Sequence, residues 1–300
     1  MASEEKRKML QEKLAQAQGI LGELDVDLWL TFVRESALLP DPALEMVVGT
    51  HVTWQSAFLV PASGETLALV GSLDRANMEA EGVFARVDGY LEGIGEPLRA
   101  ALSRLDPRRV AINFSEDSEI ADGLTHGMYL TLLRILQGTP YGERLVSAEP
   151  ILARLRGRKT SAEVLRLQQA VQAALEILGE ARGFIRPGRT EQEVAEFING
   201  LVRQRGLELA WEAAHCPAVF SGPETAGAHA SPTARHVEPG HVVNIDFGVK
   251  TGGYCSDLQR TYYVPRPGEV GVPEPVQHGL RTIVEAIGKA AAALRPGVAG

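Results

Sequence analysis

Two aspartates near the end of the chain lie in neighbouring strand-like segments. Asp246 belongs to segment 244–248 and Asp257 to segment 255–261, with a Gly-Gly turn at 252–253 between them. In a hairpin closed by that turn, carboxylates near the facing ends of the two strands converge on one point. Two convergent carboxylates in an apolar sheet either share a proton or bind a cation. The pair is the strongest indication of chemistry in this sequence.

The residues around Asp246 favour a site over a purely structural role. Apolar residues at 243, 245 and 247 alternate with those at 244, 246 and 248, so Asp246 faces away from the largest apolar side chains. An ionised carboxylate after such a buried run needs compensation. Considered singly, Asp246 is typical of a strand end, and Asp257 of a cap or an ion-pair partner of Arg260. Two hard oxygen ligands suit Mg, Mn, Co or Zn, but only with added histidine or carboxylate.

Two histidines are further candidates. His229 lies seventeen residues before Asp246 among small residues, where it is either a surface residue or a donor that contacts a substrate. His215 and Cys216 could form a thiol nucleophile or part of a zinc site. No second cysteine lies at ligand spacing and Pro217 follows, so a buried structural thiol is favoured.

Composition excludes several classes of protein. The chain has 300 residues, of which 45% are hydrophobic and 23% charged, and its net charge is −8. Such values are typical of a globular protein with two domains. Without a basic block, nucleic acid and anionic membrane are excluded as partners. Two cysteines, no apolar signal core and no long apolar run predict a cytoplasmic protein.

The elements that must position these residues change in style near residue 150. Strands alternate with helices over residues 1–150, which predicts an α/β domain. Beyond it, capping-box patterns at Thr160 and Thr190 predict helices over 161–185 and to about 205. Extended segments are expected at 218–221, 242–247, 254–258 and 261–264, followed by a helix to about 294.

A weak internal repeat relates two helix ends. Residues 178–188 match residues 287–297 at a constant offset, each ending in Arg-Pro-Gly. Chance is one interpretation, because helices often end at Pro-Gly. If the repeat is real, its second copy is followed by only Val298, Ala299 and Gly300, and we expect the domain to be cut short in this chain.

The segment from Ser221 to Thr261 resembles the metallopeptidases of the pita-bread fold, which include prolidase, Xaa-Pro aminopeptidase and methionine aminopeptidase. The resemblance rests on the two aspartates at this spacing, on His229 before them and on a Glu-Pro-Gly turn at 238–240. It covers residues 150–300 well. Residues 1–150 are similar to the N-terminal domain of the prolidase and creatinase branch in length and element order. Methionine aminopeptidases usually lack such a domain, which favours the Xaa-Pro branch of family M24.

The resemblance implies an α/β creatinase-like domain over 1–150 and an α+β pita-bread domain over 151–300, truncated in its C-terminal half. It implies an exopeptidase that cleaves Xaa-Pro bonds with two divalent metal ions (Mn, Co or Zn), which activate a water and polarise the scissile carbonyl. Asp246 would bind one metal and Asp257 would bridge both. His229 would be the catalytic residue that contacts the substrate. The family's remaining ligands, one His and two Glu, are expected beyond residue 300.

The resemblance also implies partners and leaves alternatives. The expected partners are a peptide with proline at the second position and a second copy of the chain, as a homodimer. One alternative is a non-peptidase hydrolase of the same fold, such as creatinase, which needs no metal; the retained aspartate pair argues against it. The other is a catalytically inactive binding or dimerisation protein.

Overall fold

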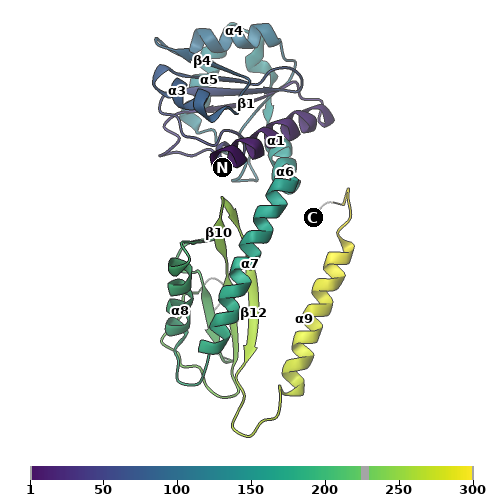
Figure 1. The fold of residues 1–300 in the computed structure, drawn as a ribbon. Helices are drawn as coiled ribbons and strands as arrows, with labels where there is room; N and C mark the ends of the chain where they lie inside the picture. The colour runs from purple at the N-terminus through teal and green to yellow at the C-terminus, as the bar shows by residue number, and fades with distance from the viewer. Residues whose placement is uncertain (1, 224–229, 299–300) are drawn as a thin grey trace. The chain divides into compact units, whose positions relative to one another are not determined.

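The computed structural model describes residues 2–223 and 230–298. The chain forms two compact units, Met1–Glu163 and Val164–Gly300, which are considered separately (Figure 1). Helix α6 (Glu149–Gly157) packs on α1 (Ala2–Glu23) and lies in the first unit, so the division between the two units follows α6. Over the described residues, every helix is too short or too polar to cross a bilayer.

The first unit is built on a six-stranded sheet with the order β4-β3-β2-β1-β5-β6. The strands are β1 (Leu28–Val33), β2 (Ser56–Pro61), β3 (Leu67–Gly71), β4 (Arg86–Tyr90), β5 (Val110–Ile112) and β6 (Leu145–Ser147). Only β2 runs antiparallel to its neighbours, and the pairs β3–β4, β1–β5 and β5–β6 are parallel. Because both faces of such a sheet are covered, β1 is an apolar run that is buried throughout.

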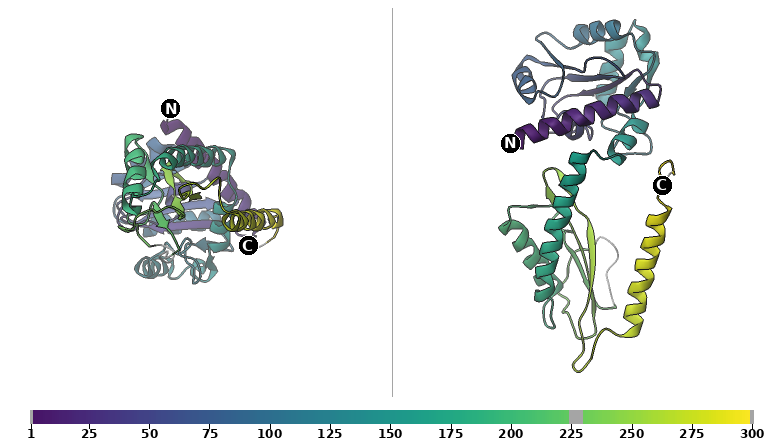
Figure 2. Two further views of the ribbon diagram at one scale, coloured as in Figure 1. Left: turned by 90° about the horizontal axis from the view of Figure 1, so that it is seen from below. Right: turned by 45° about the vertical axis from the view of Figure 1, so that its right-hand side comes forward.

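Helices cover both faces of this sheet. On one face Trp29 of β1 packs with apolar residues of α1, α2 (Leu44–Val47), α3 (Ser72–Glu81) and α6. On the other, Leu30 packs with α4 (Gly95–Leu105) and α5 (His126–Leu136), and a short 3-10 helix at Pro140–Arg144 joins that side. Figures 1 and 2 show α1 and α4 on opposite sides of the sheet. Strands alternating with helices in the sequence predict an α/β domain, and the structure forms one, with a layer of helices on each face of the sheet.

The second unit packs two helices on one face of a small antiparallel sheet. Helices α7 (Ser161–Phe184) and α8 (Glu191–Gln204) lie against the sheet β12-β9-β8, formed by β8 (Ala218–Ser221), β9 (Val242–Phe247) and β12 (Leu258–Tyr263). Both figures show α7 running alongside the strands. The apolar residues of β9 at 243, 245 and 247 are fully buried under these helices. Helix α9 (Glu274–Ala293) buries none of its residues.

A second sheet continues the same hairpin. It has the order β11-β10-β7, formed by β7 (Glu208–Leu209), β10 (Val249–Thr251) and β11 (Tyr254–Cys255). Gly252 and Gly253 both have positive φ, as a two-residue hairpin turn requires. The predicted strands at 254–258 and 261–264 were misplaced: the chain leaves β11 after Cys255, and β12 runs from Leu258 to Tyr263.

Candidate metal centre

The register of the hairpin brings Asp246 and Asp257 to the same side. Asp246 on β9 pairs with Gln259 on β12, so these two side chains share a face. Asp257 precedes Gln259 by two residues and therefore projects on that face too. The two carboxyl groups are near enough for the negative charge of Asp246 to raise the pKa of Asp257. The two carboxyl groups therefore converge: Asp246 lies directly opposite Gln259, and Asp257 is its diagonal neighbour on the adjacent strand.

Gly248 makes this approach possible. The same register holds in β10–β11 and in β9–β12, which places Gly248 opposite Asp257. A Cβ atom on Gly248 would lie 2.0 Å from the carbonyl oxygen of Ser256. Ser256 itself is buried and bonds the Val249 backbone three times: its N–H donates to the Val249 carbonyl (2.9 Å), and its hydroxyl accepts from the Val249 N–H (3.0 Å) and donates to the Val249 carbonyl (3.4 Å). These hydrogen bonds hold the backbone just before Asp257 against Val249 on the opposite strand of the hairpin.

Asp246 has an oxygen that fits a cation. Its Oδ1 atom is buried and has no hydrogen-bond partner among the residues that the structure describes. Its Oδ2 atom accepts a long hydrogen bond from Gln259 Nε2, at 3.4 Å. A buried carboxylate oxygen without a partner is costly in a protein interior, and a bound divalent cation removes that cost. The donor set on this face is therefore suited to a hard metal ion.

Asp246 also affects the titration of its neighbour. Desolvation and the negative charge of Asp246 together raise the pKa of Asp257, although much of its side chain is exposed. Such a rise is expected for two carboxyl groups at one site, and a cation between them opposes it. Among the residues that the structure describes, no third His, Cys, Asp or Glu joins the pair to form a ligand cluster.

The other predicted residues have different outcomes. His229 lies outside the described residues, so its predicted contact with the substrate stays a prediction. Cys216 is fully buried, its Sγ donates to the Gly248 carbonyl at 3.4 Å, and burial raises the pKa of its thiol. These features are those of the structural thiol that the sequence favoured, and they disfavour a thiolate nucleophile. The buried Nδ1 atom of His215, like Oδ1 of Asp246, has no hydrogen-bond partner within the described part of the chain.

Sequence reasoning missed two polar residues close to this sheet. Glu191, the first residue of α8, is 4% exposed and accepts hydrogen bonds from Ser221 and Thr233. His241 precedes β9, and its Nδ1 lies 3.0 Å from the Ser221 hydroxyl. The hydrogen-bond partners of Glu191 and His241 are distant in sequence, so no local sequence pattern predicts these contacts. For Glu191 the one available clue is that it is an extra glutamate beside the capping-box residues of α8.

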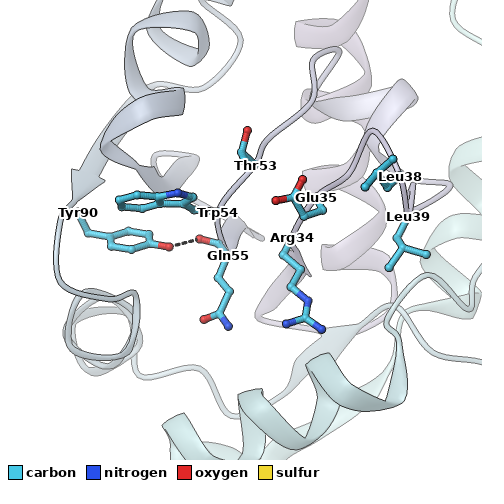
Figure 3. A pocket seen from close by; sticks show the side chains of 8 residues that line it. All are labelled: Arg34, Glu35, Leu38, Leu39, Thr53, Trp54, Gln55 and Tyr90. Atoms are coloured by element: carbon cyan, nitrogen blue, oxygen red, sulfur yellow. Dashed lines mark hydrogen bonds between the residues drawn. The ribbon is translucent and has the colours of Figure 1, made fainter.

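A separate hollow lies in the first unit, at the end of the sheet where β1 and β4 finish (Figure 3). Trp54 and Tyr90 form one wall, with ring centroids 5.9 Å apart, and the Tyr90 hydroxyl donates to the Gln55 carbonyl at 2.7 Å. Arg34, Glu35, Leu38, Leu39 and Thr53 complete the lining. This hollow contains neither of the converging aspartates, and we assign it no part in the candidate metal centre.

The family model and the curated proteins that this chain resembles agree with one another. Residues 166–300 match metallopeptidase family M24. A putative Xaa-Pro aminopeptidase of Mycoplasma pneumoniae is 32% identical over 111 residues, which cover 37% of this chain and 30% of that protein. A second, from Mycoplasma genitalium, is 30% identical over 154 residues, covering 50% of this chain and 41% of that protein. The matched regions thus span less than half the length of these curated relatives.

Solved structures agree with the fold. An Xaa-Pro dipeptidase from Bacillus anthracis superposes with a TM-score of 0.66 at 20% identity, covering 92% of this chain and 70% of that chain. The prolidase from Pyrococcus horikoshii gives 0.62 at 21% identity, covering 96% and 73%. Dipeptidase PepE from Mycobacterium ulcerans gives 0.60 at 25% identity, covering 87% and 67%. The predicted fold class, a creatinase-like α/β domain followed by a pita-bread domain, is confirmed.

Proposed function

We propose that this protein, whose residues 166–300 match metallopeptidase family M24, is a metal-dependent exopeptidase that cleaves Xaa-Pro peptide bonds. One observation carries the proposal: the strand register places Asp246 and Asp257 on a single face of the sheet, where a buried oxygen of Asp246 has no hydrogen-bond partner among the described residues. The names of the relatives, putative Xaa-Pro aminopeptidase and Xaa-Pro dipeptidase, support the choice of substrate.

The residues of this chain have distinct roles in the proposed reaction. Asp246 and Asp257 hold the metal, and Gln259 orients the Asp246 carboxylate through its hydrogen bond to Oδ2. A bound divalent pair supplies an activated water and polarises the scissile carbonyl. Gly248 and Ser256 keep Asp257 at the right place on the hairpin, since both act on the backbone just before it. His229 contacts the substrate in this proposal.

The proposal extends to the metal, the partners and the location. The resemblance to the prolidase branch implies Mn, Co or Zn as the metal, and the carboxylate oxygens of Asp246 and Asp257 are ligands that these ions accept when histidine is added. The substrate is a peptide with proline at its second position, and the protein acts as a homodimer, as the resemblance to the prolidase branch implies. Cys216 and Cys255 are both free thiols, which supports a reducing, cytoplasmic location.

A panel of peptides tests the substrate class. Full-length protein is assayed with added Mn on Ala-Pro, on Ala-Ala and on Ala-Pro with an acetylated N-terminus, and the products are separated by chromatography. An Xaa-Pro exopeptidase releases proline from the first peptide and leaves the other two intact. Equal cleavage of Ala-Ala, or no cleavage of any peptide with any of the three metals, contradicts the proposal.

A further inference from the structure

Glu191 occupies an unusual place at the start of α8. It is the first residue of the helix, and its side chain is among the few charged groups buried in the second unit, at 4% exposure. A carboxylate in the first turn usually caps its own helix, because the first backbone N–H groups have no partners there. At this helix Thr190 and Glu193 already provide a complete capping box, with hydrogen bonds of 2.9 and 3.1 Å. The Glu191 carboxylate is therefore available for another task.

Both oxygens of Glu191 bond groups that are remote in sequence. Oε1 accepts from the backbone N–H of Ser221, the last residue of β8, at 2.8 Å. Oε2 accepts from the backbone N–H of Thr233 at 2.9 Å and from its hydroxyl at 2.6 Å. Hydrogen bonds to an ionised acceptor are stronger than neutral ones, and burial strengthens them further. One carboxylate thus ties together the two chain segments on either side of residues 222–232.

Backbone hydrogen bonds strengthen the same junction, the place where Glu191 joins the Ser221 and Thr233 ends of segment 222–232. The N–H of Glu191 donates to the Arg235 carbonyl (3.0 Å), and the N–H of Gln192 donates to the Thr233 carbonyl (3.1 Å). The first turn of α8 therefore holds the 233–235 segment by its main chain as well as by the Glu191 side chain. On this side the junction is anchored to a helix that packs under the sheet of Asp246.

His241 holds the Ser221 side of the junction to that sheet. Its Nδ1 lies 3.0 Å from the Ser221 hydroxyl, and the Gly222 N–H donates to the Val242 carbonyl at 3.0 Å. Gly222 has φ +80, and a Cβ there would lie 2.9 Å from the His241 ring, so the glycine is required for this close approach. Ser221 is therefore fixed by Glu191 through its backbone and by His241 through its side chain.

We infer that Glu191 is a positioning residue: its buried carboxylate fixes Ser221 and Thr233, the two ends of the segment that contains His229, relative to the sheet that carries Asp246. The inference rests on the proposed function, in which His229 contacts the substrate. Glu191 touches neither metal nor substrate in this account. It acts by setting where the 222–232 segment leaves and rejoins the packed part of the unit.

The test compares Glu191→Gln with Glu196→Gln in the full-length protein. The amide of glutamine keeps the shape but offers one acceptor atom in place of two, so it cannot serve both Ser221 and Thr233. Glu196 lies on the exposed side of the same helix, where it pairs with Arg203. Thr233→Ala is a milder third variant, because it removes a single donor and keeps the carboxylate. Hydrogen exchange is followed by mass spectrometry on peptides that contain residues 221 and 233, with peptides of α8 as an internal reference for global stability.

The expected result is selective. In Glu191→Gln the amides of Ser221 and Thr233 exchange on the order of tenfold faster or more, relative to the α8 reference, since a charge-assisted hydrogen bond has been lost. Thr233→Ala produces a smaller rise, and Glu196→Gln none. On an Xaa-Pro dipeptide, Glu191→Gln lowers kcat on the order of tenfold or more, while its affinity for Mn stays that of the parent.

The outcomes separate this inference from the proposed function. Unchanged exchange at Ser221 and Thr233 in Glu191→Gln overturns the inference, whatever the activity. Faster exchange with the full kcat of the parent also overturns it, because the junction then has no bearing on turnover. A parent protein that cleaves no Xaa-Pro peptide refutes the proposed function, while the exchange data still decide whether Glu191 fixes the two ends of the segment.

Discussion

The sharpest structural consequence of the candidate site concerns Gly248, where a single added methyl group should damage both the fold and the metal centre. In Gly248→Ala the new Cβ would lie 2.0 Å from the Ser256 carbonyl oxygen and 2.8 Å from both the Ala210 Cβ and the Trp211 ring. Carbon atoms in proteins essentially never come within 3.0 Å of such neighbours. The two strands must therefore separate by about 1 Å, and the atom that must move most belongs to the backbone.

The magnitude follows from these distances. Overpacking of a well-packed site costs about 1–3 kcal/mol, and a clash with a backbone atom belongs at the upper end, so we expect a loss of about 3 kcal/mol in the free energy of unfolding. Asp257 follows Ser256 directly, so the same displacement moves its carboxylate away from Asp246. Changes to groups that support a metal ligand typically weaken metal binding about 10- to 100-fold, and we expect a loss of affinity for Mn in that range.

Gly253→Ala provides the matched control in the same hairpin. Gly253 has φ +85, so alanine strains the turn by roughly 1 kcal/mol, but no heavy atom lies within 4 Å of the new Cβ. Urea unfolding followed by circular dichroism measures stability, and calorimetric titration with Mn measures affinity. We expect Gly253→Ala to keep the affinity of the parent protein. If Gly248→Ala matches the parent in both measurements, the assigned hairpin geometry is wrong.

Two further predictions concern buried charges in the first unit. Lys13→Met should destabilise the protein by about 3 kcal/mol, because Lys13 is 1% exposed, pairs with Glu163 at 3.1 Å and donates to the Leu155 carbonyl. Urea unfolding of Glu163→Gln and of the double variant measures the energetic coupling between Lys13 and Glu163. A smaller loss from Lys13→Met when Glu163→Gln is already present confirms that coupling, and additive losses would exclude it. Burial raises the pKa of Asp41 despite hydrogen bonds from Asn113. The folded state therefore binds a proton at Asp41 more tightly than the unfolded state does. The resulting contribution to the free energy of unfolding is present below the ordinary Asp pKa and is lost as pH rises through the raised pKa. Asp41→Asn removes this contribution, so the stability of the parent relative to Asp41→Asn should fall as pH rises above the ordinary Asp pKa, measured by urea unfolding at a series of pH values. A difference that stays constant across the series would contradict the assignment.

Helices of the second unit were predictable because their ends are encoded locally. Thr160 with Glu163 and Thr190 with Glu193 form the expected reciprocal hydrogen bonds, and the helices begin at Ser161 and Glu191. Each signal needs residues only three positions apart, so no knowledge of the tertiary structure is required. The alternating pattern of β9 was equally informative, because burial of residues 243, 245 and 247 by α7 and α8 leaves Asp246 on the other face.

Features that depend on distant partners were not predictable. The hairpin strands break at Ser256 because its hydroxyl accepts from the Val249 N–H in place of a backbone carbonyl, and no periodic pattern encodes that exchange. The role of Glu191 depends on donors at Ser221 and Thr233, at least thirty positions away in sequence. From the sequence alone, Glu191 is an ordinary first-turn glutamate.

Metal dependence in the full-length protein tests the central claim most directly. The protein and its Asp246→Asn variant are stripped with a chelator, Mn is added back, and hydrolysis of an Xaa-Pro dipeptide is measured beside the amount of bound Mn. Our account predicts that Mn restores hydrolysis in the parent protein, and that Asp246→Asn binds less Mn and stays inactive. Hydrolysis that survives both chelation and Asp246→Asn at the rate of the parent would contradict it.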